Sequence, residues 1–202
     1  MTMRYEILAP LASGDFATVY RGRDRELARD VAIKQIHPQF LSDPRQLEMY
    51  WRGGPPLPAL EYPHIMTIYD IVRSRGWLIL ELMQGNLKQA AKGQPLDLNF
   101  LRQALAATLH ALSFLHQKGV IHGDVKPDNL RLVSEGNAVL LDLGFAHRPG
   151  ENAALLKQGY VLGTANYLAP ELCGPKTQDL FAWDLFSLGV MSFEMLAGFL
   201  PY

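Results

Sequence analysis

The sequence predicts an α+β fold in two parts, an N-terminal antiparallel sheet with one helix and a mainly helical C-terminal part. Up to Leu82, short apolar segments rich in β-branched and aromatic residues alternate with turn residues, a pattern typical of antiparallel strands. After Gly85, apolar residues recur at helical spacing instead. We therefore place a boundary after Met83, which gives domains of residues 1–83 and 84–202.

The N-terminal sheet is expected to begin with three strands between Tyr5 and Ile36, where apolar pairs and triplets are separated by polar turns. Ser42 and Asp43 then offer a cap before Pro44, and glycines follow Arg52. Because proline suits the first position of a helix and glycine ends one, Pro44–Arg52 is predicted as the single helix. Two further strands complete the sheet: Ile65–Val72 and Trp77–Leu82.

A long amphipathic helix is predicted in the C-terminal part, because residues of one face recur every three or four positions and Lys118-Gly119 supplies a stop. The residues of this face are Leu101, Leu105, Thr108, Leu109, Leu112 and Leu115. The final segment, Trp183–Ala197, is apolar on most faces and is predicted to be a buried helix.

Between these helices, Leu130–Val133 and Ala138–Leu141 are predicted to form a hairpin around a polar turn. In the expected register Leu130 faces Leu141, so that Asn129 faces Asp142 just beyond the last pair. An amide and a carboxylate then meet at one edge of the hairpin.

The composition is that of an ordinary globular protein, with 49% hydrophobic and 19% charged residues in a chain of 202. A net charge of −1 gives no support for a nucleic-acid partner, since nucleic-acid-binding proteins usually show a marked basic excess. Cys173 is the only cysteine, which excludes an intramolecular disulfide and fits a reducing compartment.

No targeting segment or membrane span is expected. The N-terminal residues as far as Asp15 are interrupted by charges and lack the apolar stretch of a signal peptide. The longest apolar stretch, Leu185–Tyr202, is interrupted by Glu194 and is shorter than a bilayer span needs, so a buried helix is the better interpretation. A cytoplasmic protein is therefore predicted.

Polar residues around the hairpin predict a cation site. Mg²⁺ prefers oxygen ligands, and it commonly binds one or two protein oxygens together with waters and substrate phosphates. Asn129 and Asp142 supply such oxygens. Pro127 disfavours a helical conformation at Lys126, so the preceding loop should be extended, with Asp124 and Lys126 pointing the same way. The same residues could instead form only a turn network beside the hairpin.

Two motifs here resemble those of protein kinases. The segment 122–129, His-Gly-Asp-Val-Lys-Pro-Asp-Asn, is similar to the catalytic loop, and residues 142–144, Asp-Leu-Gly, are similar to the magnesium-binding triplet. The resemblance implies a bilobal protein-kinase-like fold. In such a fold Asp124 accepts the proton of the substrate hydroxyl and Lys126 steadies the transferred phosphoryl group. Asn129 and Asp142 would bind Mg²⁺.

The same resemblance implies an ATP site with residues from the N-terminal domain. Lys34 would hold the α and β phosphates, and Glu48 on the predicted helix would pair with Lys34. The backbone of Glu81 and Met83 would bond adenine. The other predicted nucleotide contacts lie in the glycine-rich loop, residues 11–19, and on the strand of the lysine: Leu11, Gly14, Val19 and Ala32.

Residues 163–171, Gly-Thr-Ala-Asn-Tyr-Leu-Ala-Pro-Glu, resemble the segment that docks a peptide substrate. Thr164 and Lys126 favour the Ser/Thr subclass, and Asp184 resembles the aspartate that anchors the catalytic loop from a buried helix. The implied function is transfer of the ATP γ-phosphate to a hydroxyl of a protein substrate. Two alternatives are a kinase-like nucleotide-binding scaffold with little or no catalysis and, disfavoured by the docking segment, a small-molecule kinase.

The chain departs from the family pattern at four positions. Ala12 and Ala17 replace two glycines of the glycine-rich loop, and Arg131 stands where an apolar residue usually lies beneath adenine. Gly123 replaces an arginine that in many kinases binds a phosphate on the activation segment. Because residues 145–163 contain no serine or threonine, and Tyr160 is their only hydroxyl side chain, activity is expected not to need phosphorylation there.

The family's fold normally continues through several helices beyond a position like Tyr202, so the resemblance implies an incomplete C-terminal lobe. One face of the Trp183–Ala197 helix and the carboxylate of Glu171 would then lack their usual cover. Exposed apolar area of this kind favours association. We therefore expect a partner or a further chain segment on this face.

Overall fold

The computed structural model describes most of the chain: residues 3–14, 16–42, 47, 50–51, 61–83, 85–134, 137–152, 156, 163–173 and 181–202. The chain divides into two compact units, the first made of residues 1–61 and 66–83 and the second of residues 62–65 and 84–202. The domains expected from the sequence have the same boundary after Met83 and differ from the units in residues 62–65.

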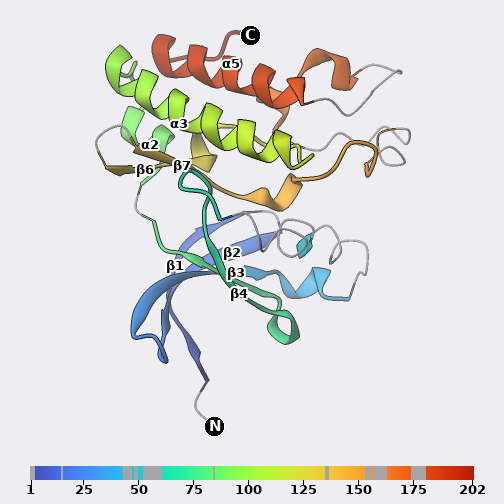
Figure 1. Cartoon of the computed structure of the whole chain (residues 1–202). Helices are drawn as coiled ribbons and strands as arrows, with labels where there is room; N and C mark the ends of the chain where they lie inside the picture. Colours follow the sequence, from blue (N-terminus) through green and yellow to red (C-terminus); the bar gives the residue numbers. More distant parts are fainter. Residues whose placement is uncertain are drawn as a thin grey trace. The chain divides into compact units, whose positions relative to one another are not determined.

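The first unit is built on a five-stranded antiparallel sheet, the kind of sheet predicted (Figure 1). Its strands are β1 (Tyr5–Ser13), β2 (Ala17–Asp24), β3 (Arg29–Ile36), β4 (Ile68–Val72) and β5 (Trp77–Glu81). Their spatial order is β1-β2-β3-β5-β4. β4 starts later than predicted because Ile65 forms a bridge with Leu140 and belongs to the second unit.

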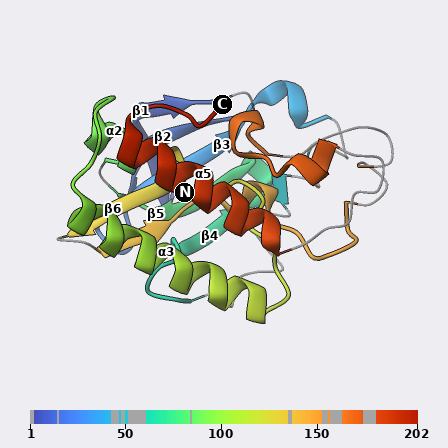
Figure 2. The same cartoon turned by 90° about the horizontal axis from the view of Figure 1, so that it is seen from above.

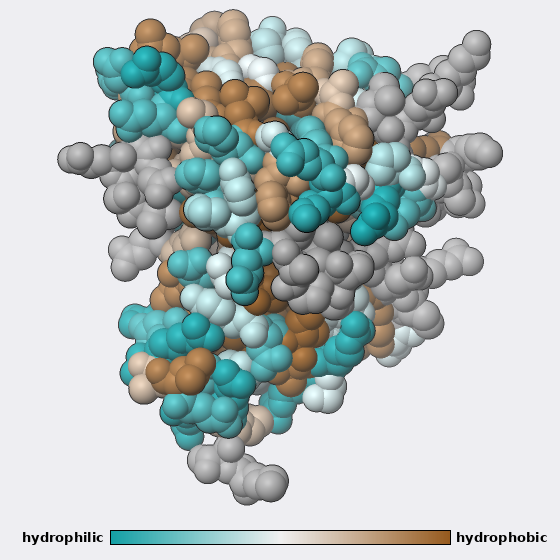
Figure 3. All heavy atoms as spheres, viewed as in Figure 1, coloured by the Kyte–Doolittle hydropathy of each residue, from teal (hydrophilic) through white to brown (hydrophobic). Residues whose placement is uncertain are grey.

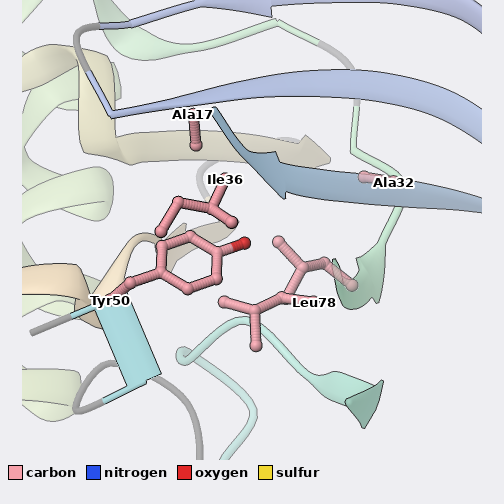
Figure 4. Packing of buried hydrophobic residues seen from close by; sticks show 6 residues of the cluster. Ala17, Ala32, Ile36, Tyr50 and Leu78 are labelled. Carbon is pink, nitrogen blue, oxygen red and sulfur yellow. The ribbon is translucent and has the colours of Figure 1, made fainter. Parts of the chain in front are cut away.

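Apolar side chains cover both faces of this sheet, since successive residues of a strand point to opposite sides. One face packs a cluster around Trp77 and Ile79. The opposite face packs the cluster drawn in Figure 4, whose buried members are Ala17, Ala32, Ile36, Tyr50, Leu78 and Leu80. Burial of apolar area on both faces therefore stabilises the sheet.

A helical segment packs on the second of these faces through Tyr50. Leu47, Tyr50 and Trp51 are helical, while most of the predicted helix Pro44–Arg52, including Glu48, lies outside the described residues. The Tyr50 ring lies beside Ile36 and Leu78 in Figure 4. Its hydroxyl lies 2.6 Å from the Lys34 carbonyl oxygen and 3.2 Å from the Gly76 carbonyl oxygen, so its proton is shared between them. This hydroxyl ties the helical segment to the sheet.

The second unit is mainly helical, as predicted. It contains α2 (Leu87–Ala91), α3 (Leu98–Gln117) and α5 (Ala182–Ala197), and α3 and α5 lie side by side in both views (Figures 1 and 2). Asp97 caps α3 by accepting hydrogen bonds from two backbone amides of its first turn. The short α2 was not predicted, although Asn86 and Gln89 form a capping box at its start.

A two-stranded hairpin, β6 (Leu130–Ser134) and β7 (Asn137–Leu140), follows α3. Leu130 pairs with Leu140, so the expected pairing with Leu141 is wrong by one residue. The strands continue to the ends of a shorter turn than predicted, and β6 is irregular before Ser134, which shifts the register.

The hairpin still ends close to the predicted place. The amide of Leu141 donates to the carbonyl oxygen of Asn129 at 2.8 Å, so Asp142 lies one residue beyond this pair. Short 3₁₀ helices complete the regular structure of the described residues: η1 (Pro38–Phe40), η2 (Arg73–Arg75), η3 (Pro127–Asn129), η4 (Leu143–Phe145), η5 (Ala165–Tyr167) and η6 (Pro170–Cys173).

The last helix, α5, is buried on only one side. Trp183, Asp184 and Met191 are buried. Large apolar residues of the outer side and of the turn that follows are exposed: Leu185, Phe193, Leu196 and Phe199. Apolar atoms are accordingly visible over this helix in Figure 3. Within the described ranges, the structure has no helix whose length and apolar character would suit a membrane crossing.

Replacing Tyr50 by Phe is expected to lower the free energy of unfolding of the first unit by about 1 kcal/mol, because two buried carbonyl oxygens lose a shared donor. Chemical denaturation followed by fluorescence measures this change. The matched control is Tyr202→Phe, which removes an exposed hydroxyl. Equal stability of the two variants would contradict the role given to the Tyr50 hydroxyl.

Candidate active site

The segment 121–129 lies against the residues that follow β7. Ile121 and His147 exchange two backbone hydrogen bonds, from the amide of Ile121 at 2.8 Å and from the amide of His147 at 3.1 Å. His122 is fully buried next to this bridge. The amide of Asp124 donates to Nδ1 of His122 at 3.2 Å, so Nε2 carries the ring proton and donates it to the Leu141 carbonyl oxygen at 2.8 Å. The neutral imidazole thus joins the start of the loop to the end of β7.

The carboxylate of Asp184, on α5, holds the backbone of His122 and Gly123. It is 1% exposed and accepts hydrogen bonds from the amide of His122 at 2.8 Å and from the amide of Gly123 at 2.9 Å. Nε2 of His116, in the last turn of α3, lies 2.8 Å from the same carboxylate and therefore donates to it. A buried carboxylate is costly without such donors. The prediction that Asp184 finds backbone donors is confirmed, while His116 was not predicted.

Asp124 lies at the centre of a compact polar cluster. It is 4% exposed, and its Oδ2 lies 2.8 Å from Nζ of Lys126 and accepts a hydrogen bond from Nδ2 of Asn129 at 2.9 Å. Nζ of Lys126 also donates to Oγ1 of Thr164 at 2.6 Å, so the Thr164 hydroxyl proton is directed to Oδ1 of Asp124, at 2.6 Å. Asp124, Lys126 and Thr164 form a closed triangle of charge-assisted hydrogen bonds.

Asn129 is held by its amide nitrogen, which donates to the backbone carbonyl of Asp124 at 2.8 Å and to the carboxylate of Asp124. These two hydrogen bonds use both N–H groups of the Asn129 side chain and do not involve its oxygen. Its oxygen therefore keeps the lone pairs that a hard cation takes.

Asp142 adopts a left-handed conformation, with φ 57° and ψ 77°, that is uncommon for a residue other than glycine. Its Oδ1 accepts a hydrogen bond from the amide of Gly144 at 3.1 Å. Strained conformations of this kind cluster at functional sites. In the part of the chain that the structure describes, no group of three His, Cys, Asp or Glu side chains could hold a metal by itself.

Gly123 allows the loop to approach the residues after β7. Its φ is +78°, and a Cβ would lie 2.9 Å from the carbonyl oxygen of Phe145. Gly163, with φ of +116°, faces it, because a Cβ there would lie 2.7 Å from the carbonyl oxygen of Gly123. A small cavity of about 20 Å³, enough for one water, lies beside Gly123.

The segment 163–171 is supported by α5. The hydroxyl of Tyr167 donates to the carboxylate of Glu194, and the hydroxyl of Ser187 donates to the Tyr167 carbonyl oxygen at 2.7 Å. Burial and the hydrogen bond to Glu194 raise the pKa of Tyr167 above its ordinary value. Tyr167 therefore stays a neutral donor, and Thr164 is held three residues away.

The predicted nucleotide residues of the first unit lie on its sheet and on the chain after β5. Lys34 on β3 pairs with Val19 on β2 and with Leu78 on β5. Ala32 is buried, whereas Leu11 is exposed. The Glu81 amide donates to the Thr67 carbonyl oxygen at 3.1 Å, so this amide is already bonded within the first unit.

The other predicted nucleotide residues are Gly14, Met83 and Glu48. Gly14 donates through its amide to the Ala17 carbonyl oxygen at 3.0 Å. Met83 is half-buried at the end of the first unit. Glu48 lies outside the described residues, so its predicted pairing with Lys34 stays a prediction.

Comparison with known proteins identifies the family. Residues 5–202 match the model of the protein kinase domain. The chain belongs to the protein kinase family. The kinase is 35% identical to a probable serine/threonine-protein kinase, pknA2, of Bifidobacterium longum over 206 residues, which is 98% of this chain. It is 32% identical to the serine/threonine-protein kinase pkn2 of Myxococcus xanthus and 30% identical to PknL of Mycobacterium tuberculosis, again over 98% of the chain.

These relatives are longer than the kinase chain. The chain spans 27% of the Bifidobacterium protein, 25% of the Myxococcus protein and 50% of PknL. The similarity therefore supports a kinase domain of the Ser/Thr type, in agreement with the bilobal α+β fold expected from the sequence.

Replacing Asp184 by Asn is expected to lower the free energy of unfolding by about 2–4 kcal/mol. The buried carboxylate accepts hydrogen bonds from three donors, and the NH₂ group of Asn would face one of these donors without an acceptor between them. Thermal and chemical denaturation measure the loss. Asp97→Asn is the matched control, since Asn caps a helix about as well as Asp. Similar stability for both variants would be inconsistent with an anchoring carboxylate.

Proposed function

We propose that the chain is the catalytic domain of a Ser/Thr protein kinase that transfers the γ-phosphate of ATP to a hydroxyl of a protein substrate. One observation carries this proposal: the buried carboxylate of Asp124 is held by Lys126, Asn129 and Thr164. A carboxylate, a cation and a hydroxyl in direct contact form a defined receptor for a substrate hydroxyl and a phosphoryl group.

In this proposal Asp124 orients the substrate hydroxyl and accepts its proton. The bonds from Asn129 and Thr164 fix the plane of the carboxylate, and the ammonium group of Lys126 lies 2.8 Å from its Oδ2. Lys126 would also balance charge on the transferred phosphoryl oxygens. Phosphoryl transfer needs positioning and charge stabilisation more than covalent catalysis, and these side chains supply both.

Magnesium would be held by Oδ1 of Asn129 and by the carboxylate of Asp142. The donor set fits, because both are hard oxygen ligands and the Asn129 amide is already oriented by two hydrogen bonds. When bound, the cation would neutralise the charge of the ATP phosphates. Leu11, Gly14, Val19, Ala32 and Lys34 would bind the nucleotide from the first unit.

We further propose that activity does not require a phosphate on the activation segment. The described residues that line the cavity beside Gly123 include no lysine or arginine. Their apolar members are Leu156, Leu168, Leu172 and Trp183. Among the described lining residues His147 is the only basic side chain, and Asp184 adds a carboxylate, so these surroundings give a phosphate little ionic support. Neutral donors hold the loop instead. The amides of His122 and Gly123 donate to Asp184, and the Thr164 hydroxyl donates to Asp124.

A kinase-like scaffold with weak nucleotide binding is the second candidate, and Arg131 favours it. The side chain of Arg131 is half-buried, its Nε is buried without a hydrogen-bond partner, and burial lowers the pKa of its guanidinium. A desolvated cation is a less favourable neighbour for a purine than an apolar side chain, unless the guanidinium stacks on the base. Nucleotide affinity decides between these candidates.

A protein partner or a further chain segment on α5 is also proposed. Exposed Phe193 and Leu196 lie on one face of this helix, and Phe199 follows. Covering them would remove apolar area from water. The substrate is proposed to be a protein carrying Ser or Thr.

Replacing Asp124 by Asn is expected to lower kcat for phosphoryl transfer by about 10²- to 10⁴-fold, because the proton acceptor is lost. Transfer of labelled phosphate from ATP with Mg²⁺ to a generic protein substrate measures kcat, and a thermal shift with Mg²⁺ and ATP measures binding. Asp128→Asn, which removes an exposed carboxylate of the same loop, is the control. Equal activity of the parent and Asp124→Asn would refute the assigned role, while binding without transfer in the parent favours the scaffold.

Treatment with a broad-specificity phosphatase is expected to leave the initial rate unchanged, and so is the substitution Tyr160→Phe. The reason is that ordering of the loop comes from Asp184 and from the triangle at Asp124, neither of which involves a phosphate. Mass spectrometry before and after treatment verifies the removal of phosphate. Loss of activity together with loss of a phosphate from Tyr160 or Thr164 would disprove this independence.

A further inference from the structure

In the described residues of the glycine-rich loop, 11–14 and 16–19, no backbone conformation lies in the left-handed region that favours glycine. Gly14 does not have a positive φ, and a Cβ placed on it would meet only the Ala17 carbonyl oxygen, at 3.8 Å. Ala12 lies in β1, directly after an irregularity between Pro10 and Ala12, and Ala17 is the first residue of β2. In this conformation alanine therefore fits at all three positions. Something other than glycine must select the conformation of the loop.

A chain of three side chains crosses the base of this loop. Oγ1 of Thr18 lies 3.0 Å from Oγ of Ser13 and 3.0 Å from Nε2 of His37. Ser13 is the last residue of β1, Thr18 lies opposite it near the start of β2, and His37 directly follows β3. We call Ser13, Thr18 and His37 the hydroxyl strap. The strap connects both sides of the loop to a third strand.

Backbone and ring contacts also join the loop to the segment that follows β3. The amide of His37 donates to the carbonyl oxygen of Phe16, within the loop, at 2.9 Å. The ring of Phe16 lies against Phe40 of η1, with centroids 5.1 Å apart, and the His37 ring stacks on Phe40 at 6.3 Å. The loop is thus fastened to the segment after β3 by one backbone bond, one side-chain bond and one aromatic contact.

The strap lies on the face of β2 that the predicted nucleotide residues do not use. Ala17 and Val19 belong to the cluster with Ala32, on one face of the sheet, whereas Tyr20 belongs to the cluster of the opposite face. Because side chains alternate along a strand, Thr18 shares the face of Tyr20. The strap can therefore hold the loop without occupying the side proposed for ATP.

The strap is compatible with either tautomer of His37. If Nε2 is unprotonated, Thr18 donates to it and accepts from Ser13. If Nε2 carries a proton, Thr18 accepts from it and donates to Ser13. Hydroxyl groups both donate and accept, so the chain of bonds reverses direction and is not broken.

We infer that the hydroxyl strap holds the glycine-rich loop in the conformation that binds nucleotide. Two glycines that would make the loop adaptable are missing, and the strap takes over their role. Ser13, Thr18 and His37 therefore set the nucleotide affinity without contacting the nucleotide. This inference rests on the proposed function. Ordering a loop on binding costs conformational entropy, and a loop that is held beforehand avoids part of this cost. Loss of the strap should therefore weaken binding more than it slows phosphoryl transfer.

The test compares Thr18→Val, which replaces the hydroxyl by a methyl group of similar shape, with Thr18→Ser, which keeps the hydroxyl. Thr18→Val is expected to raise the Kd for Mg²⁺–ADP and the KM for ATP by about three- to tenfold, the equivalent of one to two lost hydrogen bonds. The value of kcat should fall by less than KM rises. Thr18→Ser should restore the parent Kd. An unchanged Kd in Thr18→Val overturns the inference.

A double-mutant cycle separates the strap from general destabilisation. His37→Phe keeps an aromatic ring beside Phe40 and the backbone bond to Phe16, and removes Nε2. Combined with Thr18→Val, it should raise Kd no further than either single change, because both break the same chain. Additive effects would show that the two residues act independently and would overturn the strap.

Hydrogen exchange gives a readout that needs no nucleotide. The amides of Gly14 and His37, both bonded within the loop region, should exchange faster in Thr18→Val than in Thr18→Ser.

If the parent protein binds Mg²⁺–ADP but transfers no phosphate, the proposed function fails while the strap is still judged by Kd. If the parent binds no nucleotide, both the affinity claim and the proposed function fail. Unchanged exchange refutes the ordering step in either case.

Discussion

The buried carboxylate of Asp184 is the interaction on which the rest of the candidate site depends. A carboxylate that is 1% exposed is stable only with donors on its oxygens, and here the donors are the amides of His122 and Gly123 and the imidazole of His116. The Asp184 carboxylate therefore holds the backbone at His122 and Gly123 in place. This role accounts for a buried carboxylate in the first turn of the largely apolar helix α5.

From this anchor, hydrogen bonds lead outward to the reactive groups. His122, fixed as one tautomer by the Asp124 amide, binds the end of β7, from which Asp142 follows. Asp124 is then held by side chains from its own loop and by Thr164 from a distant segment. Each step satisfies a buried polar group. Preorganisation of this kind is what phosphoryl transfer requires from a protein.

The departures from the family pattern differ in their physical effect. Gly123 permits a close backbone approach that a side chain would prevent, because a Cβ there would lie 2.9 Å from the Phe145 carbonyl oxygen. Ala12 and Ala17 remove backbone freedom from the glycine-rich loop, and a side-chain strap on the outer face supplies its order. Arg131 has no comparable compensation among the described contacts, because its buried Nε lacks a partner.

The sequence by itself determined the two-part α+β fold, the family and the choice of Asp124, Lys126, Asn129 and Asp142 as candidates, because residue type and local spacing carry that information. The order of the sheet, the hairpin register and the contributions of His116, Thr18 and His37 were decided only by tertiary structure. Leu130 meets Leu140 because of an irregular strand, and His116 meets Asp184 across 68 positions of sequence. Such contacts depend on how helices and strands pack, and packing is set by the whole core and not by any local pattern.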